Sequence, residues 1–315
     1  MSAVRGRFAP SPTGRMHLGN IRSALLGWLQ ARAAHGRFLL RVEDLDRARC
    51  KPQHVEELLR DLAWLGLDWD EAPLFQSQRD GLYRDAQAKL EREGLVYPCF
   101  CTRAEIARAA SAPHGLSDEG PRYPGTCARL TREQASERAR TRAPAYRFRA
   151  RPGELRFVDG VQGPYTQDVD AAVGDFVVRR NDGVASYQLA VVVDDAATDI
   201  THVLRGDDLL SSTPRQLQLY TALGLPAPAF LHVPLVMGED GRRLAKREGA
   251  FALAELRERG VAPERVLGLL AAWSGLGDGS PLTLAELVHG FRPEKLPRAP
   301  VVAGEAALRK ALGLE

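Results

Sequence analysis

GRFAPSPTGRMHLGN, residues 6–20, decides the fold expected of this chain. Residues 6–10 are short and extended, the turn-rich segment 11–14 follows, and apolar residues then recur at helical spacing over residues 17–34, closed by Gly36. This order predicts a strand, a loop and a helix. Such a loop at a helix N-terminus presents backbone N–H groups and a positive dipole end, which favours phosphate binding. On these residues alone, a histidine that only caps the helix is an equally good interpretation.

The residues that follow predict a second strand and a second helix. Residues 37–44 alternate well enough for a strand, and residues 52–65 open on a proline and have the spacing of an amphipathic helix. A strand, helix, strand, helix order predicts a parallel sheet, which binds ligands at the carboxyl ends of its strands.

The later part of the chain returns to strands and then becomes helical. The pattern predicts strands at 175–180 and 184–193 joined by a turn at 181–183, a strand at 200–204, a helix at 214–223 and a strand at 231–236. Helices predominate from Ala262, and the end of the chain, from about residue 301, is expected to fray.

The composition is that of a folded globular protein. Of 315 residues, 44% are apolar and 26% charged, which excludes a disordered or fibrous chain and predicts about two domains. The sequence has no apolar run of about 18 residues and no apolar segment at its start, so we expect a cytoplasmic protein. Four cysteines in so long a chain make no disulfide framework, which fits a reducing compartment. We expect a monomer, because no exposed apolar repeat suggests otherwise.

A basic segment interrupts the predicted sheet between about residues 99 and 151. Glycine, proline, arginine and cysteine dominate it, and the capping box at residues 131–134 indicates one helix. From Arg103 to Arg151 there are 11 arginines against 5 acidic residues, a net charge of +6, whereas the rest of the chain sums to −3. This asymmetry points to a polyanion partner at one surface, and a solvated arginine-rich face is the alternative.

Three cysteines of this segment could hold a metal ion. Cys99 and Cys101 are one residue apart, and Cys127 follows at a distance. Zinc prefers four soft or borderline ligands in a tetrahedron, and this arrangement is a common way to provide most of them. Reduced cysteines that pack or stay free are the alternative. Cys50, in the loop before a predicted helix, is not expected to take part.

A second motif, GRRLAKR at residues 241–247, lies in a glycine-rich loop after a predicted strand. Together with HLGN at residues 17–20, it resembles the class I aminoacyl-tRNA synthetases, and specifically their glutamyl branch. HLGN is similar to the HIGH signature, and RLAKR at 243–247 is similar to the KMSKS signature in its KLSKR form. The blocks at 6–14, 41–46 (RVEDLD) and 187–195 (YQLAVVVDD) also resemble the family, so five blocks match in order.

The number of residues after the second motif indicates which members of the glutamyl branch the chain resembles most. Only 69 residues follow Lys246, whereas ordinary glutamyl-tRNA synthetases carry a large helical anticodon-binding region there. The chain therefore resembles the truncated paralogues of the branch, which activate L-glutamate with ATP to glutamyl-adenylate and transfer it to queuosine in the anticodon loop of tRNA(Asp). The alternatives are a glutamyl-tRNA synthetase acting on the tRNA 3′ end and a catalytically inactive RNA-binding paralogue.

The resemblance implies the residues of the active site. The residues implied for ATP, which enters with Mg²⁺, are His17, Gly19, Asn20 and Lys246, of which His17 and Lys246 are the catalytic pair. The residues implied for glutamate are Arg7, Phe8, Ala9, Pro10, Ser11, Glu43, Tyr187 and Arg205. Arg7 and Arg205 are the candidates for a bidentate pair with the side-chain carboxylate, because such a pair rejects glutamine. Glu43 would receive the α-ammonium group and Tyr187 would donate or accept a hydrogen bond.

Two of these assignments have plain structural alternatives. Arg205 could instead form an ion pair with Asp207 or Asp208, and Tyr187 could be a half-buried residue of a sheet. The sequence also departs from the family pattern. Arg243 and Ala245 replace the lysine and the serine of KLSKR, which weakens the expected closure of the loop over ATP, and Asn20 replaces the second histidine of HIGH.

The resemblance extends to the metal site and to the domain organisation. Truncated paralogues hold zinc with the pattern Cys-x-Cys…Tyr-x-x-x-Cys, which Cys99, Cys101, Tyr123 and Cys127 match, while His114 is a rival fourth ligand. The expected α/β architecture is a Rossmann-type parallel-sheet catalytic domain with a zinc-bearing insertion and a short helical C-terminal tail. The predicted boundaries are 1–98 for the first half, 99–174 for the insertion and its basic surface, 175–260 for the second half with the KLSKR-like loop, and 261–315 for the tail.

Overall fold

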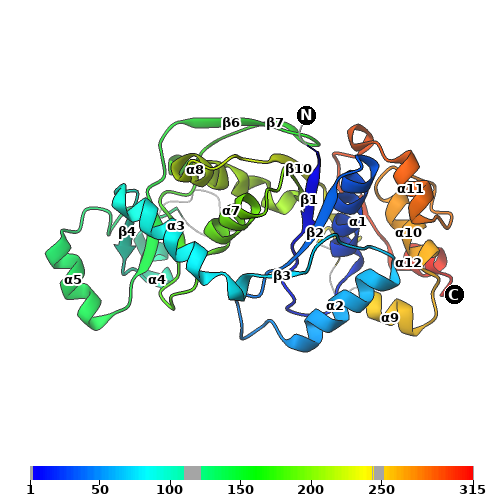
Figure 1. Ribbon diagram of the computed structural model, residues 1–315, viewed down its shortest axis with the longest axis horizontal. Helices are drawn as coiled ribbons and strands as arrows, with labels where there is room; N and C mark the ends of the chain where they lie inside the picture. Colours follow the sequence, from blue (N-terminus) through cyan, green and yellow to red (C-terminus); the bar gives the residue numbers. More distant parts are fainter. Residues whose placement is uncertain (1–2, 110–121, 243, 245–251, 315) are drawn as a thin grey trace.

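The computed structural model describes residues 3–109, 122–242, 244 and 252–314 (Figure 1). Lys246, its neighbours Arg243, Ala245 and Arg247, and the rival ligand His114 lie outside the described residues. Among the described residues, no helix combines the length and the apolar character needed to cross a lipid bilayer.

Parallel strands form the centre of the region that the sequence predicts to be a Rossmann-type domain, as expected. Strand β2 pairs in parallel with β1 and β3, and β9 pairs in parallel with β10. Strands β1 and β9 lie beside each other, where the Thr201 N–H donates to the Arg5 carbonyl oxygen (3.0 Å). The strands are β1 (Arg5–Phe8), β2 (Arg37–Val42), β3 (Leu74–Phe75), β9 (His202–Gly206) and β10 (Ala229–Val233).

Apolar side chains of these strands alternate between two cores. Leu40 and Leu204 face the core that contains the central helix, and Leu39 and Val203 face the opposite core. The first core is covered by α1 (Leu18–Ala33), α2 (Pro52–Trp64), α9 (Leu253–Glu258), α10 (Pro263–Ala272), α11 (Leu284–Gly290) and α12 (Glu305–Leu312). The second is covered by α3 (Asp80–Arg92), α7 (Tyr187–Ala197) and α8 (Thr213–Leu223), and short 3₁₀ turns occupy Gln76–Gln78, Asp207–Ser212 and Pro293–Lys295. Burial on both faces explains why apolar residues occupy consecutive positions of these strands, as at Phe38–Leu40 and Val203–Leu204.

A three-stranded antiparallel sheet carries the insertion on the left of Figure 1. Its strands are β4 (Val96–Cys99), β5 (Ala145–Phe148) and β8 (Phe176–Arg179), so this sheet includes residues on both sides of the predicted boundaries at 98/99 and 174/175. The other elements are α4 (Arg103–Ala109), α5 (Arg132–Thr141), the hairpin of β6 (Glu154–Asp159) and β7 (Gly163–Asp168), and α6 (Val169–Ala172). Helix α5 begins with the predicted capping box, in which Thr131 and Gln134 satisfy each other's backbone N–H groups.

The strand predicted at residues 184–193 is wrong, because helix α7 occupies most of it. Ser186 caps this helix by accepting the Leu189 N–H (3.4 Å). Residues 189–195 are all buried, and an apolar run that is buried on every side has no helical or strand periodicity to read. Tyr187 is therefore the first residue of a helix, and the alternative that placed it in a sheet is also wrong.

The end of the chain is ordered up to residue 314, which corrects the expectation that it frays. Strand β12 (Val301–Val302) pairs in parallel with β11 (Val236–Met237). Leu308 and Leu312 of α12 are each 1% exposed, because their i, i+4 spacing turns both toward the core. Apolar burial thus holds the C-terminal segment against the catalytic region.

Candidate active site

A cavity of about 830 Å³ opens at the carboxyl ends of β1, β2 and β9. Leu244, two residues before Lys246 in the chain, lines it beside the end of β11. The cavity also brings together every predicted glutamate-binding residue and the described ATP-binding ones: Arg7, Phe8, Ala9, Pro10, Ser11, Glu43, Tyr187, Arg205, His17, Gly19 and Asn20. Residues far apart in the sequence therefore form one site, where a parallel sheet is expected to bind its ligand.

His17 is the N-cap of α1 and one wall of this cavity. Its Nδ1 accepts the backbone N–H of Asn20 (3.4 Å), so the proton of the neutral ring lies on Nε2. A Cβ at Gly19 would lie 3.3 Å from His17 Nδ1, which explains why a glycine suits this position. The wall thus combines a histidine with the positive end of a helix dipole, an arrangement suited to an anion.

Arg7 is fixed in the cavity by a buried carboxylate that the sequence analysis did not single out. Its Nε and Nη2 donate to the two oxygens of Asp195 (3.2 and 3.5 Å). Arg41 also forms an ion pair with Asp195, and it donates to Glu43 from Nη2 (3.1 Å). Burial acts to raise the pKa of Asp195, but the guanidinium groups of Arg41 and Arg7 outweigh it and hold this pKa below its usual range. The Nε/Nη2 edge of Arg7 is therefore occupied by the protein, and its Nη1/Nη2 edge is the one that remains for a ligand.

The sequence contained one indication of this ion network. Arg41 lies between apolar residues of a predicted strand, and Asp195 ends an apolar run, so both charges occur where burial is expected. A charge in such a place needs a partner of opposite sign. The sequence could not indicate which partner, because the pairing joins β2 to α7, more than 150 residues apart.

Glu43 follows β2 and is the predicted receptor of the α-ammonium group. Burial raises its pKa, and the nearby guanidinium groups of Arg41 and Arg7 act in the opposite direction. Its side chain is 9% exposed and lines the cavity. A buried carboxylate of this kind would be stabilised in its charged form by an arriving ammonium group.

Arg205 is a buried cation that forms no ion pair with a carboxylate in the described part of the chain. Its Nη1 donates to the Tyr187 hydroxyl (3.2 Å), its Nη2 donates to Thr213 Oγ1 (2.9 Å) and Gln216 Oε1 (2.8 Å), and its Nε donates to His232 (2.9 Å). The ion pair with Asp207 or Asp208, given above as an alternative, does not form. Burial lowers the pKa of Arg205, and the residue is only 6% exposed. A buried positive charge without a neutralising partner favours an anionic ligand.

Arg22 of α1 is a third buried arginine at the cavity, after Arg7 and Arg205, and the sequence analysis missed it. Its Nε donates to Ser274 Oγ (3.0 Å) and its Nη1 to the Pro234 carbonyl oxygen (2.6 Å), while Nη2 has no hydrogen-bond partner among the described residues. Burial lowers its pKa to about 10, against the opposing charge of Asp207. The Arg22 guanidinium therefore adds positive charge to the same cavity that His17 lines.

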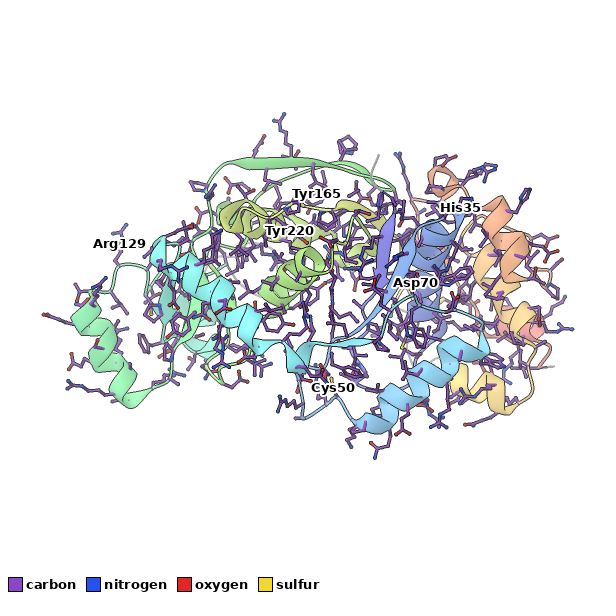
Figure 2. All side chains as sticks on the ribbon, in the orientation of Figure 1. His35, Cys50, Asp70, Arg129, Tyr165 and Tyr220 are labelled. Carbon is purple, nitrogen blue, oxygen red and sulfur yellow. The ribbon has the colours of Figure 1, made fainter. Side chains whose placement is uncertain are left out.

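Three cysteine sulfurs gather in the insertion within 4.8 Å of one another. The Sγ atoms of Cys101 and Cys127 are 3.6 Å apart, and the Tyr123 hydroxyl is 3.3 Å from Cys99 Sγ and 3.9 Å from Cys101 Sγ. Cys50 lies in the loop before α2 (Figure 2) and does not belong to this group, as predicted. The cluster joins the end of β4 to residues 123–127, and its donor atoms suit a metal ion.

A second cavity, of about 880 Å³, lies beside the cysteine cluster and between the insertion and the loop after β2. Its charged lining is mainly arginine: Arg49, Arg103, Arg142, Arg147 and Arg180, with Asp46. Basic residues of the insertion therefore meet basic residues from outside it. Three arginines of the basic segment, Arg103, Arg142 and Arg147, thus line this hollow.

Comparisons with known proteins agree with this geometry. A 306-residue alignment with the glutamyl-Q tRNA(Asp) synthetase of Symbiobacterium thermophilum is 55% identical and covers 94% of each chain. The glutamate–tRNA ligase 1 of Halorhodospira halophila is 46% identical over 94% of this chain and 64% of its own. A crystal structure of a glutamate tRNA ligase from Elizabethkingia meningosepticum in complex with its amino acid superposes with a TM-score of 0.85 at 27% identity, over 98% of this chain and 69% of the other.

The family assignment follows from the extent of these matches. Residues 3–285 match the family model described as tRNA synthetases class I (E and Q), catalytic domain. This range includes the cavity, the second core, the insertion and most of the first core, whose remaining residues lie between 287 and 312. The chain belongs to the class I tRNA synthetases, in the family of their E and Q catalytic domains.

Proposed function

We propose that this protein activates L-glutamate with ATP to glutamyl-adenylate and transfers the glutamyl group to queuosine in the anticodon loop of tRNA(Asp). The observation that carries the proposal is Arg205, a buried cation without a carboxylate partner in the described chain, in one cavity with His17 at the start of α1. A carboxylate ligand and a phosphate ligand would thus lie close together. Relatives that carry the name glutamyl-Q tRNA(Asp) synthetase, at 46 to 55% identity, support this choice within the family.

In this proposal two arginines share the glutamate side chain. Asp195 occupies the Nε and Nη2 edge of Arg7, and His232, Thr213 and Gln216 occupy that edge of Arg205. Arg7 keeps the N–H groups of its Nη1/Nη2 edge for the ligand, and Arg205, whose Nη1 also donates to Tyr187, keeps one Nη1 N–H, so both arginines could donate to one carboxylate. Glutamine would place an amide N–H₂ against these donors, which disfavours it strongly.

Adenylate formation needs orientation and charge stabilisation, and no nucleophilic side chain. An oxygen of the glutamate α-carboxylate attacks the α-phosphorus of ATP, the bond to the bridging oxygen breaks, and pyrophosphate leaves. His17 Nε2 and the first N–H groups of α1 would donate to phosphate oxygens, and Gly19 and Asn20 would line the nucleotide. Lys246 is proposed for the β- and γ-phosphates from the motif alone. Mg²⁺ accompanies ATP in class I synthetases and would neutralise part of the phosphate charge.

The second cavity is proposed as the place where the RNA backbone lies. Its five arginines against one aspartate suit phosphates, and phosphate contacts supply much of the affinity of proteins for RNA.

A second candidate function is aminoacylation of a tRNA 3′ end, which the relative named glutamate–tRNA ligase 1 favours at 46% identity. In both cases an acceptor hydroxyl attacks the glutamyl carbonyl carbon and AMP leaves.

Two measurements on the purified protein decide among these functions. Glutamate-dependent exchange of label between pyrophosphate and ATP, run without RNA, is expected to occur, and its absence would make the protein an inactive paralogue. Nucleoside mass spectrometry of tRNA(Asp) after incubation with ATP and glutamate is expected to find the glutamyl group on queuosine. A glutamyl group on the 3′-terminal adenosine would establish the second candidate instead.

The cysteine cluster is proposed to hold one structural Zn²⁺. A Zn–S bond of about 2.3 Å in a tetrahedron separates the sulfurs by roughly 3.8 Å. The 3.6 Å between Cys101 and Cys127 is close to this value, and the Tyr123 oxygen lies on the same side at 3.3 and 3.9 Å from two sulfurs. The ion would tie the end of β4 to the segment that carries Tyr123, with Cys99, Cys101, Cys127 and Tyr123 as ligands.

The zinc assignment predicts how four variants bind the metal. The protein purified from zinc-containing medium is expected to hold one equivalent of zinc by mass spectrometry, and Cys99→Ser with Cys127→Ser is expected to lose it, because two of four ligands disappear. Cys50→Ser is the matched control and should keep the metal. Tyr123→Phe should weaken binding measured with a chelator, whereas His114→Ala should not. A folded wild-type protein without metal would contradict the assignment, and the opposite order of the last two variants would make His114 the fourth ligand.

A further inference from the structure

Three buried side chains form a row behind the wall of the active-site cavity. Arg205 on β9 and His232 on β10 are paired neighbours in the parallel register of these strands, and Asp159 ends β6. His232 is 0% exposed, Asp159 2% and Arg205 6%. Arg205 Nε donates to His232 Nε2 (2.9 Å), and His232 Nδ1 lies 2.6 Å from Asp159 Oδ2. Arg205 reaches the cavity, whereas His232 and Asp159 do not line it.

The hydrogen bonds determine which nitrogen of His232 carries the proton. A guanidinium Nε only donates, so His232 Nε2 must accept and the proton must lie on Nδ1. That Nδ1–H points at Asp159, whose other oxygen already accepts the backbone N–H groups of Val161, Gln162 and His232 (2.9, 2.9 and 3.1 Å). Asp159 therefore selects the one tautomer of His232 that can accept from Arg205.

The contact with His232 completes the fixation of Arg205. Thr213 and Gln216 accept from Nη2, and the Tyr187 hydroxyl accepts from Nη1. Because a guanidinium is planar, holding Nε and Nη2 on one edge leaves the remaining nitrogen, Nη1, at the cavity. Without an acceptor at Nε, the group could rotate about its last side-chain bonds and lose that orientation.

Asp159 reaches this place because the turn of the β6–β7 hairpin packs against β10. The Gly160 N–H donates to the Phe230 carbonyl oxygen (2.9 Å), and the Gln162 side-chain amide donates to the His232 carbonyl oxygen (3.0 Å). A Cβ at Gly160 would come within 2.8 Å of Leu231 Cγ, so the close approach requires a glycine. The hairpin, part of the predicted insertion, thereby places a carboxylate behind the glutamate pocket.

We propose that His232 and Asp159 are positioning residues for Arg205, which set the orientation of its guanidinium and with it the affinity and selectivity for the side-chain carboxylate of the substrate. The proposal rests on the proposed function, since it takes glutamate as the ligand of Arg205. It assigns His232 and Asp159 no contact with substrate. Their effect on the reaction passes through Arg205, directly at its Nε–H and also through Thr213, whose Oγ1 lies 3.3 Å from His232 Nε2 and accepts from Arg205 Nη2.

Two variants of His232 separate its two contacts. In His232→Asn the amide nitrogen takes the place of Nδ1 and still donates to Asp159, but Arg205 loses its acceptor. In His232→Gln the amide oxygen takes the place of Nε2 and accepts from Arg205, but the contact with Asp159 is lost. We expect the asparagine variant to raise the KM for glutamate at least tenfold with an unchanged KM for ATP, because a buried charged donor loses its partner. The glutamine variant is expected to stay within about threefold of the wild type.

Asp159→Asn tests the tautomer selection. Its amide N–H₂ would face His232 Nδ1 and drive the proton to Nε2, where it meets the Arg205 Nε–H. We expect at least the same tenfold rise in KM for glutamate, and a smaller preference for glutamate over glutamine. His202→Asn is the matched control, since His202 begins β9 at the end of the strand away from the cavity, and its kinetics should equal those of the wild type.

The outcomes distinguish this proposal from the proposed function. If the wild type gives no glutamate-dependent exchange, the function fails before the variants are compared, and the ring nitrogen signals of His232 in NMR still test the tautomer. Protonated Nδ1 with unprotonated Nε2 is expected, and the reverse would overturn the proposal. If the wild type is active, equal KM values for glutamate in the asparagine and glutamine variants would show that His232 has only a structural role and does not position Arg205. If the asparagine variant does not fold, the NMR result and Asp159→Asn decide.

Discussion

Replacing Arg205 by methionine is expected to lower kcat/KM for glutamate by about a thousandfold in ATP–pyrophosphate exchange. The guanidinium is buried, and the described chain gives it no carboxylate partner, so the proposed ligand would be the anion that neutralises it. Truncating one member of a desolvated charge pair costs about 2 to 5 kcal/mol, and about 4 kcal/mol corresponds to a thousandfold. Methionine keeps an unbranched chain of similar length and adds no charge.

Two further measurements, the KM for ATP and the melting temperature, separate a loss of glutamate binding from a general loss of structure. Replacing Arg205 leaves no carboxylate of the described chain unpaired, although the buried acceptors His232 Nε2 and Gln216 Oε1 lose a donor at about 1 to 3 kcal/mol. We therefore expect a smaller loss of stability than from replacement of Arg7, which would deprive the buried Asp195 carboxylate of a partner. Arg5→Met is the control on β1, because Arg5 pairs with Glu71 outside the cavity. A variant at Arg205 that still prefers glutamate over glutamine as strongly as the wild type would remove Arg205 from the pocket.

Replacing His17 by asparagine is expected to lower kcat for exchange by about a hundredfold while leaving the melting temperature unchanged. Asparagine is a good N-cap, so the hydrogen bond to the Asn20 N–H can be kept. The imidazole Nε2–H is lost, and removal of one preorganised donor to a transition-state charge costs on the order of 3 kcal/mol. We therefore expect kcat to fall while the melting temperature stays the same.

His17→Ala provides the comparison. It removes both the cap and the donor, so we expect the same loss of kcat together with a decrease of about 1 kcal/mol in the free energy of unfolding. Thermal denaturation and exchange kinetics on both variants check this. If asparagine restores full activity, His17 only caps the helix, which is the simpler interpretation of residues 6–20.

The strand predicted at residues 184–193, most of which is helix α7, shows where sequence patterns fail. The strand at 175–180 and the turn after it were predicted correctly, because both have local causes in alternation and turn residues. The apolar residues that follow form α7, since burial on all sides removes the periodicity that separates helix from strand. The C-terminal residues were expected to fray, yet packing of Leu308 and Leu312 orders them, and only the facing helices could reveal that.

The sequence by itself determined the strand, loop and helix at the start of the chain, because these have local backbone causes, and its resemblance to the family identified the candidate binding residues that gather at the cavity, except Arg22. Only the tertiary structure decided which edge of each arginine remains available to a ligand. Asp195 and His232 come from segments distant from Arg7 and Arg205, and burial makes their hydrogen bonds obligatory. Pairings of this kind depend on side chains meeting across elements, and no local pattern in the chain encodes them.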